Sequence, residues 1–101
     1  PILKRELVLT PSADQTFAKL VDLYRRTTGT RLTSSHVARA MLKAVAHCME
    51  ELEREAGRIG PLKLPANARG REVERERFEA RIADAFAAGM RASAAFHPDD
   101  Y

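Results

Sequence analysis

The hydrophobic pattern changes its period near the amino end of the chain, and this change constrains the fold more than any other feature. In residues 3–9 the leucines fall on odd positions, with Lys4 and Glu6 on even positions, and such a period of two is typical of a strand with one buried face. From Phe17 onward the apolar residues recur at helical spacing, and Thr10-Pro11-Ser12 between the two segments is a helix-start signal. One strand cannot satisfy its own backbone donors and acceptors. The sequence therefore predicts a strand whose partner comes from elsewhere, followed at once by a helix.

Two helices are expected after this strand. The first begins at Pro11 or Ser12 and ends before Gly29, which can adopt the left-handed conformation of a C-cap. The second is expected from about Ser35 to Ala56, and its apolar side chains cover a wide arc. One neighbouring helix cannot cover so wide an arc, so the pattern favours a helix packed between several others, as at the centre of a dimer.

The remainder of the chain divides into an extended segment and a last helix. Residues 57–70, GRIGPLKLPANARG, contain three Gly and two Pro and are expected to form an extended strap over the core. The predicted organisation is thus a domain over residues 3–56, a strap over 57–70 and an amphipathic carboxy-terminal helix over 71–96. The apolar stripe of this last helix, which needs a surface to cover it, consists of Phe78, Ile82, Phe86 and Met90.

Charge is distributed unevenly along the 101 residues, although the net charge is only +3. Residues 1–50 carry eight Lys or Arg against four Asp or Glu, whereas residues 51–101 carry nine against ten. This asymmetry favours contact of the first half with a polyanion. No apolar run approaches the roughly 20 residues of a membrane span. The single cysteine, Cys48, fits a protein of the reducing cytoplasm.

The order of these elements resembles that of ribbon-helix-helix DNA-binding proteins of the MetJ/Arc type. The resemblance covers residues 3–52 and rests on RELVLT as the ribbon, PSADQTFAKLVDLYRRTTG as the first helix with its turn, and LTSSHVARAMLKAV as the start of the second helix. In that family two copies pair their single strands into an antiparallel ribbon whose outward side chains enter the major groove. The second helix holds a backbone phosphate at its N-terminus. The resemblance implies a mainly α, ribbon-helix-helix-like fold, dimeric through the strand, with a carboxy-terminal helical extension.

Strand and helix geometry places candidate DNA contacts at two positions. With the leucines inward, the strand period turns Lys4, Glu6 and Val8 outward. Lys4 can reach a guanine edge or a phosphate, Val8 can touch a thymine methyl group, and Glu6 is unfavourable near phosphates unless it accepts from a cytosine amino group. The second position is the start of the second helix, where free backbone N–H groups and the helix dipole favour an anion. Its candidate residues are Arg31, Thr33, Ser34, Ser35 and Arg39.

Neither metal binding nor catalysis is indicated by the sequence. His47 and Cys48 are neighbours on a helix and point in different directions. His36 lies about 16 Å away along the helix, so the three side chains cannot share one ion. No Gly-rich phosphate loop, GxSxG or HExxH motif occurs. We therefore expect no enzyme activity, no catalytic residues, no cofactor and no metal.

We expect a homodimer that binds double-stranded DNA sequence-specifically, as a transcriptional regulator or as an accessory protein of plasmid partition or conjugation, without membrane contact. Two alternatives stay open. In the first, the chain is a helical protein–protein interaction module, antitoxin-like or an adaptor, in which residues 57–101 contact a partner. In the second, it is a helix-turn-helix protein whose recognition helix is TRLTSSHVARAMLK, although that helix is long and apolar for a groove.

Overall fold

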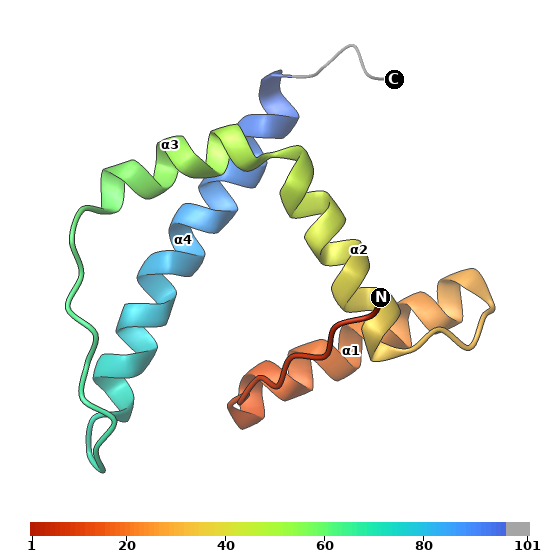
Figure 1. Cartoon of the computed structure of the whole chain (residues 1–101), viewed down its shortest axis with the longest axis horizontal. Coiled ribbons are helices and arrows are strands. Elements are labelled where there is room, and N and C mark those ends of the chain that lie inside the picture. Colours follow the sequence, from red (N-terminus) through yellow and green to blue (C-terminus); the bar gives the residue numbers. More distant parts are fainter. Residues whose placement is uncertain (97–101) are drawn as a thin grey trace. The chain divides into compact units, whose positions relative to one another are not determined.

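The structure is a computed structural model that describes residues 1–96 (Figure 1). Residues 97–101, the end of the segment expected to contact a protein partner, lie outside the described residues. The chain forms two compact units, residues 1–43 and residues 44–101, here called unit 1 and unit 2. All regular secondary structure of the described part is helical: α1 (Pro11–Thr28), α2 (Ser34–His47), α3 (Met49–Ile59) and α4 (Glu72–Phe96).

The predicted amino-terminal strand is absent from the structure, and the expected ribbon-helix-helix fold is wrong in this respect. Residues 1–10 form no regular secondary structure. Side chains of both predicted faces are exposed, Leu7 to 78% and Val8 to 102%. The physical reason is that a strand exists only where a second segment exchanges backbone hydrogen bonds with it, and residues 1–96 contain no strand. The chain is mainly α, as expected, but its described regular structure is entirely helical.

Capping groups fix both ends of α1, at the positions that the sequence indicates. The Thr10 side chain accepts a hydrogen bond from the Ala13 backbone N–H at 3.2 Å. At the other end, Gly29 has a left-handed φ of 67° and donates its N–H to the carbonyl of Arg25. The Arg25 side chain then holds the connector to α2, because its Nε donates to the carbonyl of Leu32 at 2.7 Å.

The long second helix expected from the sequence is two helices, because the helical hydrogen bonding changes at Cys48. The Cys48 N–H donates to the carbonyl of Val45, one residue closer than in an α-helix, and the φ of Cys48 is −123°. The first hydrogen bond of α3 runs from the Leu52 N–H to the carbonyl of Cys48. The thiol is buried, with Sγ 3.4 Å from the carbonyl of Ala44. Cys48 is thus a small buried side chain.

Helices α3 and α4 of unit 2 pack against each other (Figure 1). Gly89 of α4 lies directly on Leu52 of α3, since a Cβ at position 89 would be 2.7 Å from Leu52 Cδ2 and 3.1 Å from Leu52 Cα. Only a residue without a side chain permits this approach. Three members of the predicted apolar stripe therefore stay beside the contact: Ile82, Phe86 and Met90 are 43%, 41% and 42% exposed.

The connector between α3 and α4 is shorter than the predicted strap, because α3 continues to Ile59. Its end is held by side chains of α4. Arg75 Nη1 donates to the carbonyl of Ala68 at 3.0 Å, and Glu72 Oε1 accepts from the Gly70 N–H at 3.3 Å. Hydrogen bonds from the N–H groups of Glu72 itself and of Gly70 hold the pKa of the Glu72 carboxyl below its usual value. A negative charge at this position also suits the helix N-terminus.

Few side chains of either unit are buried. Among the described residues, the buried apolar side chains are Val21, Val37 and Cys48, whereas sixteen large hydrophobic side chains are exposed. Four of the exposed ones belong to α4. Large apolar side chains in water favour association with another surface. The arrangement of the single chain thus leaves apolar surface for a partner.

Candidate nucleic-acid interface

Thr33 and His36 build the start of α2. The carbonyl of Thr33 accepts the Val37 N–H at 3.2 Å, which is the first hydrogen bond of the helix. In return, the Thr33 N–H donates to His36 Nδ1 at 3.0 Å, and the Thr33 hydroxyl oxygen lies 2.9 Å from the same nitrogen. The bond from the Thr33 N–H to the His36 side chain corresponds to one half of a capping box, with His in place of Glu or Gln. Because Nδ1 accepts the backbone N–H, the hydrogen of the imidazole is on Nε2.

The first turn of α2 presents backbone N–H groups that no intrahelical carbonyl can reach. The partial positive charge of the helix dipole lies at the same end. All five residues predicted for the anion site are exposed and belong to one continuous segment: Arg31, Thr33, Ser34, Ser35 and Arg39.

A shallow cavity of about 520 Å³ lies beside this helix start, within unit 1. Lys19, Asp22 and Arg25 line it from α1, and Ser34 lines it from α2. Lys19 and Arg25 are not among the site residues predicted from the sequence. The available signal was their spacing, because positions 19, 22 and 25 follow each other at intervals of three on one face of a helix.

The other predicted contacts lie on the amino-terminal segment. Lys4, Glu6 and Val8 are exposed and belong to no secondary structure element. Among the hydrogen bonds and ion pairs of residues 1–96, none joins these three side chains to the start of α2. The predicted residues of the helix start thus belong to one segment, and no hydrogen bond or ion pair of the described residues ties those of the amino-terminal segment to them.

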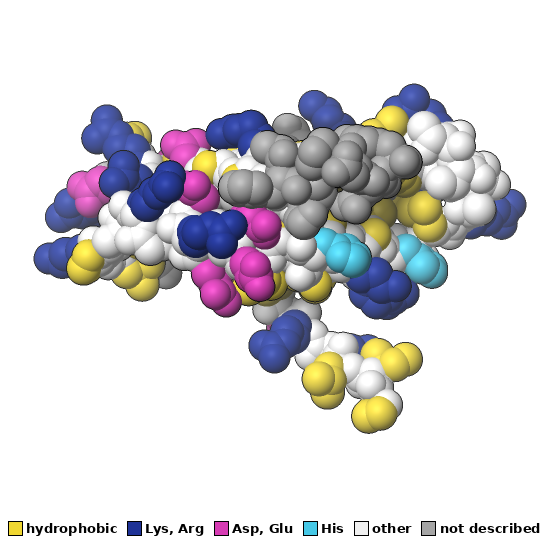
Figure 2. All heavy atoms as spheres, turned by 90° about the horizontal axis from the view of Figure 1, so that it is seen from above, with side chains coloured by type: hydrophobic (Ala, Val, Ile, Leu, Met, Phe, Trp, Pro, Cys, Tyr) yellow, Lys and Arg dark blue, Asp and Glu magenta, His cyan; other side chains and the backbone are white. Residues whose placement is uncertain are grey.

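Charge pairing distinguishes the two units. Unit 1 has eight Lys or Arg against three Asp or Glu, and its ion pair in the described residues is Arg26–Asp22 at 3.5 Å. Its other seven cations form no ion pair with any acidic side chain of residues 1–96. Figure 2 shows Asp and Glu side chains interleaved with Lys and Arg over α3 and α4. The ion pairs of unit 2 each join residues three apart: Arg54–Glu51 at 3.8 Å, Arg58–Glu55 at 3.1 Å, Arg71–Glu74 at 2.7 Å and Arg75–Glu72 at 3.7 Å.

The rest of the described chain adds no second kind of site. In residues 1–96, no group of three or more His, Cys, Asp or Glu side chains is arranged to hold a metal ion. No helix in the same range has the length and apolarity needed to cross a bilayer. The chain matches no protein-family model, no curated protein and no solved structure. The functional proposal therefore depends on the geometry and charge of the site itself.

Proposed function

We propose that the protein is a homodimer that binds double-stranded DNA through unit 1. It acts as a transcriptional regulator, or as an accessory protein of plasmid partition or conjugation, in the cytoplasm. One observation carries the proposal. Seven of the eight Lys and Arg side chains of unit 1 form no ion pair with an acidic side chain of the described residues. A nucleic acid supplies the missing negative charge, and release of its counterions favours the complex.

In this proposal the start of α2 holds a backbone phosphate. The N–H groups of Ser34 and Ser35 donate to phosphate oxygens, and Arg31 supplies the charge of the contact. Asp22 in the adjacent cavity opposes an anion, but Asp22 is paired with Arg26 at 3.5 Å, which reduces the repulsion. Contacts of this kind fix the position of the protein on DNA without reading its sequence.

Base reading is assigned to the exposed amino-terminal segment. Lys4 donates to guanine O6 or N7, Val8 contacts a thymine methyl group, and Glu6 accepts from a cytosine amino group. These contacts need exposed side chains, which the segment has, and they do not need a strand. The resemblance of residues 3–52 to MetJ/Arc-type proteins stays a prediction.

The length of α2 favours a second way of reading DNA. The sequence predicted a helix too long and too apolar for a groove, but α2 has 14 residues and most of its side chains are exposed. A short connector that begins with Gly29 joins α1 to α2, as in a helix-turn-helix motif. In this alternative, Arg39 and Lys43 of α2 read base edges in place of Lys4.

A fluorescence-anisotropy titration against duplex DNA tests the proposal. A preferred site is first selected from a random duplex library, and binding to this site and to random duplex is then measured over a series of salt concentrations. We expect binding to random duplex at low salt, with an affinity that falls as salt rises. Lys4→Ala and Arg39→Ala separate the two ways of reading, because only the variant that loses a base contact loses preference for the selected site.

Absence of binding by the wild-type chain to every duplex at low salt would refute DNA binding in both forms. The protein–protein interaction module, with residues 57–101 as its contact segment, would then be the better assignment.

A further inference from the structure

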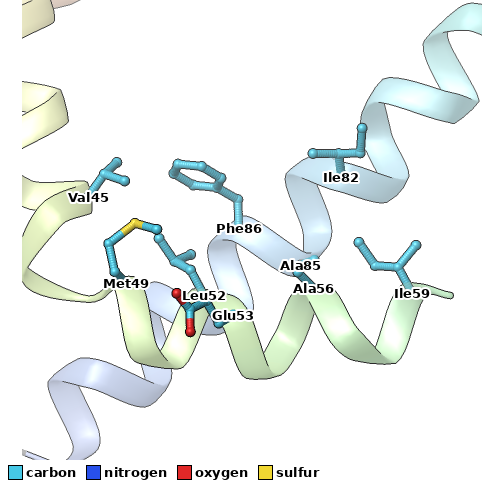
Figure 3. Close-up of a pocket in the computed structure, with 9 residues that line it drawn as sticks. All are labelled: Val45, Met49, Leu52, Glu53, Ala56, Ile59, Ile82, Ala85 and Phe86. Carbon is cyan, nitrogen blue, oxygen red and sulfur yellow. The ribbon is translucent and has the colours of Figure 1, made fainter. Parts of the chain in front are cut away.

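Unit 2 has an open apolar groove between α3, α4 and the last turn of α2 (Figure 3). Its volume is about 310 Å³. Met49 lines it from α3, Ile82 and Phe86 line it from α4, and Val45 lines it from α2. Glu53 is the charged side chain among the residues that line it. The groove therefore suits an occupant that is mainly apolar and brings one positive charge.

The way in which α3 and α4 meet leaves this groove open. Gly89 contacts Leu52 directly, which brings the two helices close together at that point. Phe86 and Ile82 then lie beside the contact, where they are 41% and 43% exposed, and Met49 of α3 is 46% exposed. Covering these side chains removes apolar surface from water, which is favourable.

We infer that a second copy of this chain covers the groove, so that the α3–α4 pairs of two copies form the dimer contact. The inference rests on the homodimer of the proposed function and names where its copies meet. Residues 44–96 carry nine Lys or Arg and nine Asp or Glu, so two such surfaces do not repel each other. Unit 1 carries eight against three and repels its own copy.

The unpaired charges of unit 2 are complementary to those of a second copy. Four ion pairs within the chain leave five cations and five acids of residues 44–96 without an ion pair. Glu53 lines the groove, and Arg77 and Arg81 of α4 are among the cations that are left. In a two-fold contact each copy offers both signs at once, so an α4 arginine of one copy meets Glu53 of the other.

The exposed apolar area of this face matches what a dimer needs. A standard interface buries about 800 Å² on each partner, of which about 450 Å² is apolar. A large side chain carries roughly 200 Å² of surface, the value typical of aromatic residues. Four large side chains of this face are 41–46% exposed and together leave about 350 Å² uncovered: Met49, Ile82, Phe86 and Met90. The half-buried Leu52 and Ile59 add to this area, so the face supplies the apolar centre of a standard interface.

Sedimentation equilibrium of the full chain at micromolar concentration tests the inference. Phe86→Glu places a charge in the groove, whereas Val73→Glu places the same charge on α4 at a side chain that is 63% exposed and does not line the groove. We expect the wild type and Val73→Glu to be dimers, and Phe86→Glu to raise the dissociation constant of the dimer by about 100-fold or more. Circular dichroism checks that each variant keeps its helix content.

Each outcome of this experiment decides the inference. A Phe86→Glu chain that dimerises like the wild type overturns it and leaves the homodimer and DNA binding standing. A monomeric wild type overturns both the inference and the homodimer. The groove would then be assigned to an occupant other than a second copy of the chain. If Phe86→Glu does not fold, Met49→Lys on α3 is measured by the same criterion. Binding of the wild type to duplex DNA at low salt is measured separately. Failure of the DNA-binding proposal can therefore be distinguished from failure of the dimer inference.

Discussion

Units 1 and 2 have nearly equal numbers of basic side chains but use them differently. Unit 2 has nine Lys or Arg, and four of them pair with a Glu three residues away in the sequence. Unit 1 has eight, and in the described residues Arg26 is the one with an acidic partner. The net charge of +3 does not reveal this difference. A polyanion is attracted by the cations that a fold leaves unpaired, and these are concentrated in unit 1.

The local pairs of unit 2 are weak but sufficient to change its field. An exposed ion pair between residues three apart contributes less than about 1 kcal/mol. Each pair nevertheless places a negative charge beside a guanidinium, and the two fields cancel beyond a few ångströms. The charges of four arginines of unit 2 are therefore compensated by a neighbouring Glu, whereas only Arg26 of unit 1 has an acidic partner among the described residues.

The largest effect on DNA binding is expected from a substitution of Lys4, which belongs to unit 1. Lys4→Ala removes a base contact worth about 1–3 kcal/mol if it is bidentate, and it should reduce the preference for the selected site over random duplex. Glu6→Gln should act in the opposite direction and raise affinity for random duplex, because it removes a negative charge that faces the phosphates. Anisotropy titrations of both variants measure these changes. Equal loss of affinity for both duplexes in Lys4→Ala would show that Lys4 contacts only phosphate.

The next effect concerns stability, because unit 2 depends on a close helix contact that unit 1 lacks. Gly89→Ala should lower the free energy of unfolding by about 1–2 kcal/mol, since overpacking against Leu52 costs about 1–3 kcal/mol and the gain in helix propensity returns up to about 1 kcal/mol. Gly57→Ala is the control, because its Cβ meets nothing within 4 Å and α3 gains propensity. Urea unfolding measures both. Stabilisation by both substitutions would show that α3 and α4 are farther apart than described.

A smaller effect separates paired from unpaired arginines directly. Arg31→Ala should weaken binding to every duplex equally and reduce the slope of log K against log salt by about 1 for each of the two copies in the dimer. Arg71→Ala is the matched control in unit 2, where Arg71 is paired with Glu74 at 2.7 Å. It should leave both quantities unchanged. A similar decrease in slope for the two variants would break the comparison, because pairing within the chain would then not matter for DNA binding.

The smallest effect is the response of α4 to acid. The pKa of Glu72 is lowered, so its carboxylate stabilises the first turn of α4 at any pH above 4.5, the ordinary pKa of the group. This contribution is lost as the pH falls through the lowered pKa of the folded state. Amide hydrogen exchange of the first turn should therefore become faster in acid, after correction for the intrinsic pH dependence. Glu72→Gln should remove this pH dependence. An unchanged acid response in that variant would assign it to another carboxylate.

The sequence predicted the local features of the fold and missed those that depend on contacts. Thr10 and Gly29 mark the ends of α1 because capping is a property of a few neighbouring residues. The break at Cys48 has no such mark: Cys48 continues the apolar spacing of the helix, and neither Gly nor Pro interrupts the sequence there. The strand over residues 3–9 was predicted from alternation alone, which specifies a strand only when a partner is present.

In the candidate site, too, the sequence predicted the residues that are neighbours in the chain and missed those that only the fold brings near them. The segment from Arg31 to Arg39 could be found because capping residues and basic residues are close in sequence. Lys19 and Arg25 share one face of α1, as their spacing indicates, but the sequence does not show that this face lines the cavity beside Ser34. The apolar stripe of α4 was expected to be covered, but the glycine beside it makes the contact instead.

The contact between Gly89 and Leu52 has a consequence for how this protein can change during evolution. A methyl group at position 89 would lie 3.1 Å from Leu52 Cα and 3.2 Å from Leu52 N, as well as 2.7 Å from Leu52 Cδ2, so a smaller residue at 52 alone does not relieve the tight backbone contact. Any lineage that replaces Gly89 must therefore shift the spacing of the two helices, which also reshapes the groove beside them. Substitutions at position 89 should accordingly be inherited together with changes at the groove positions 82 and 86.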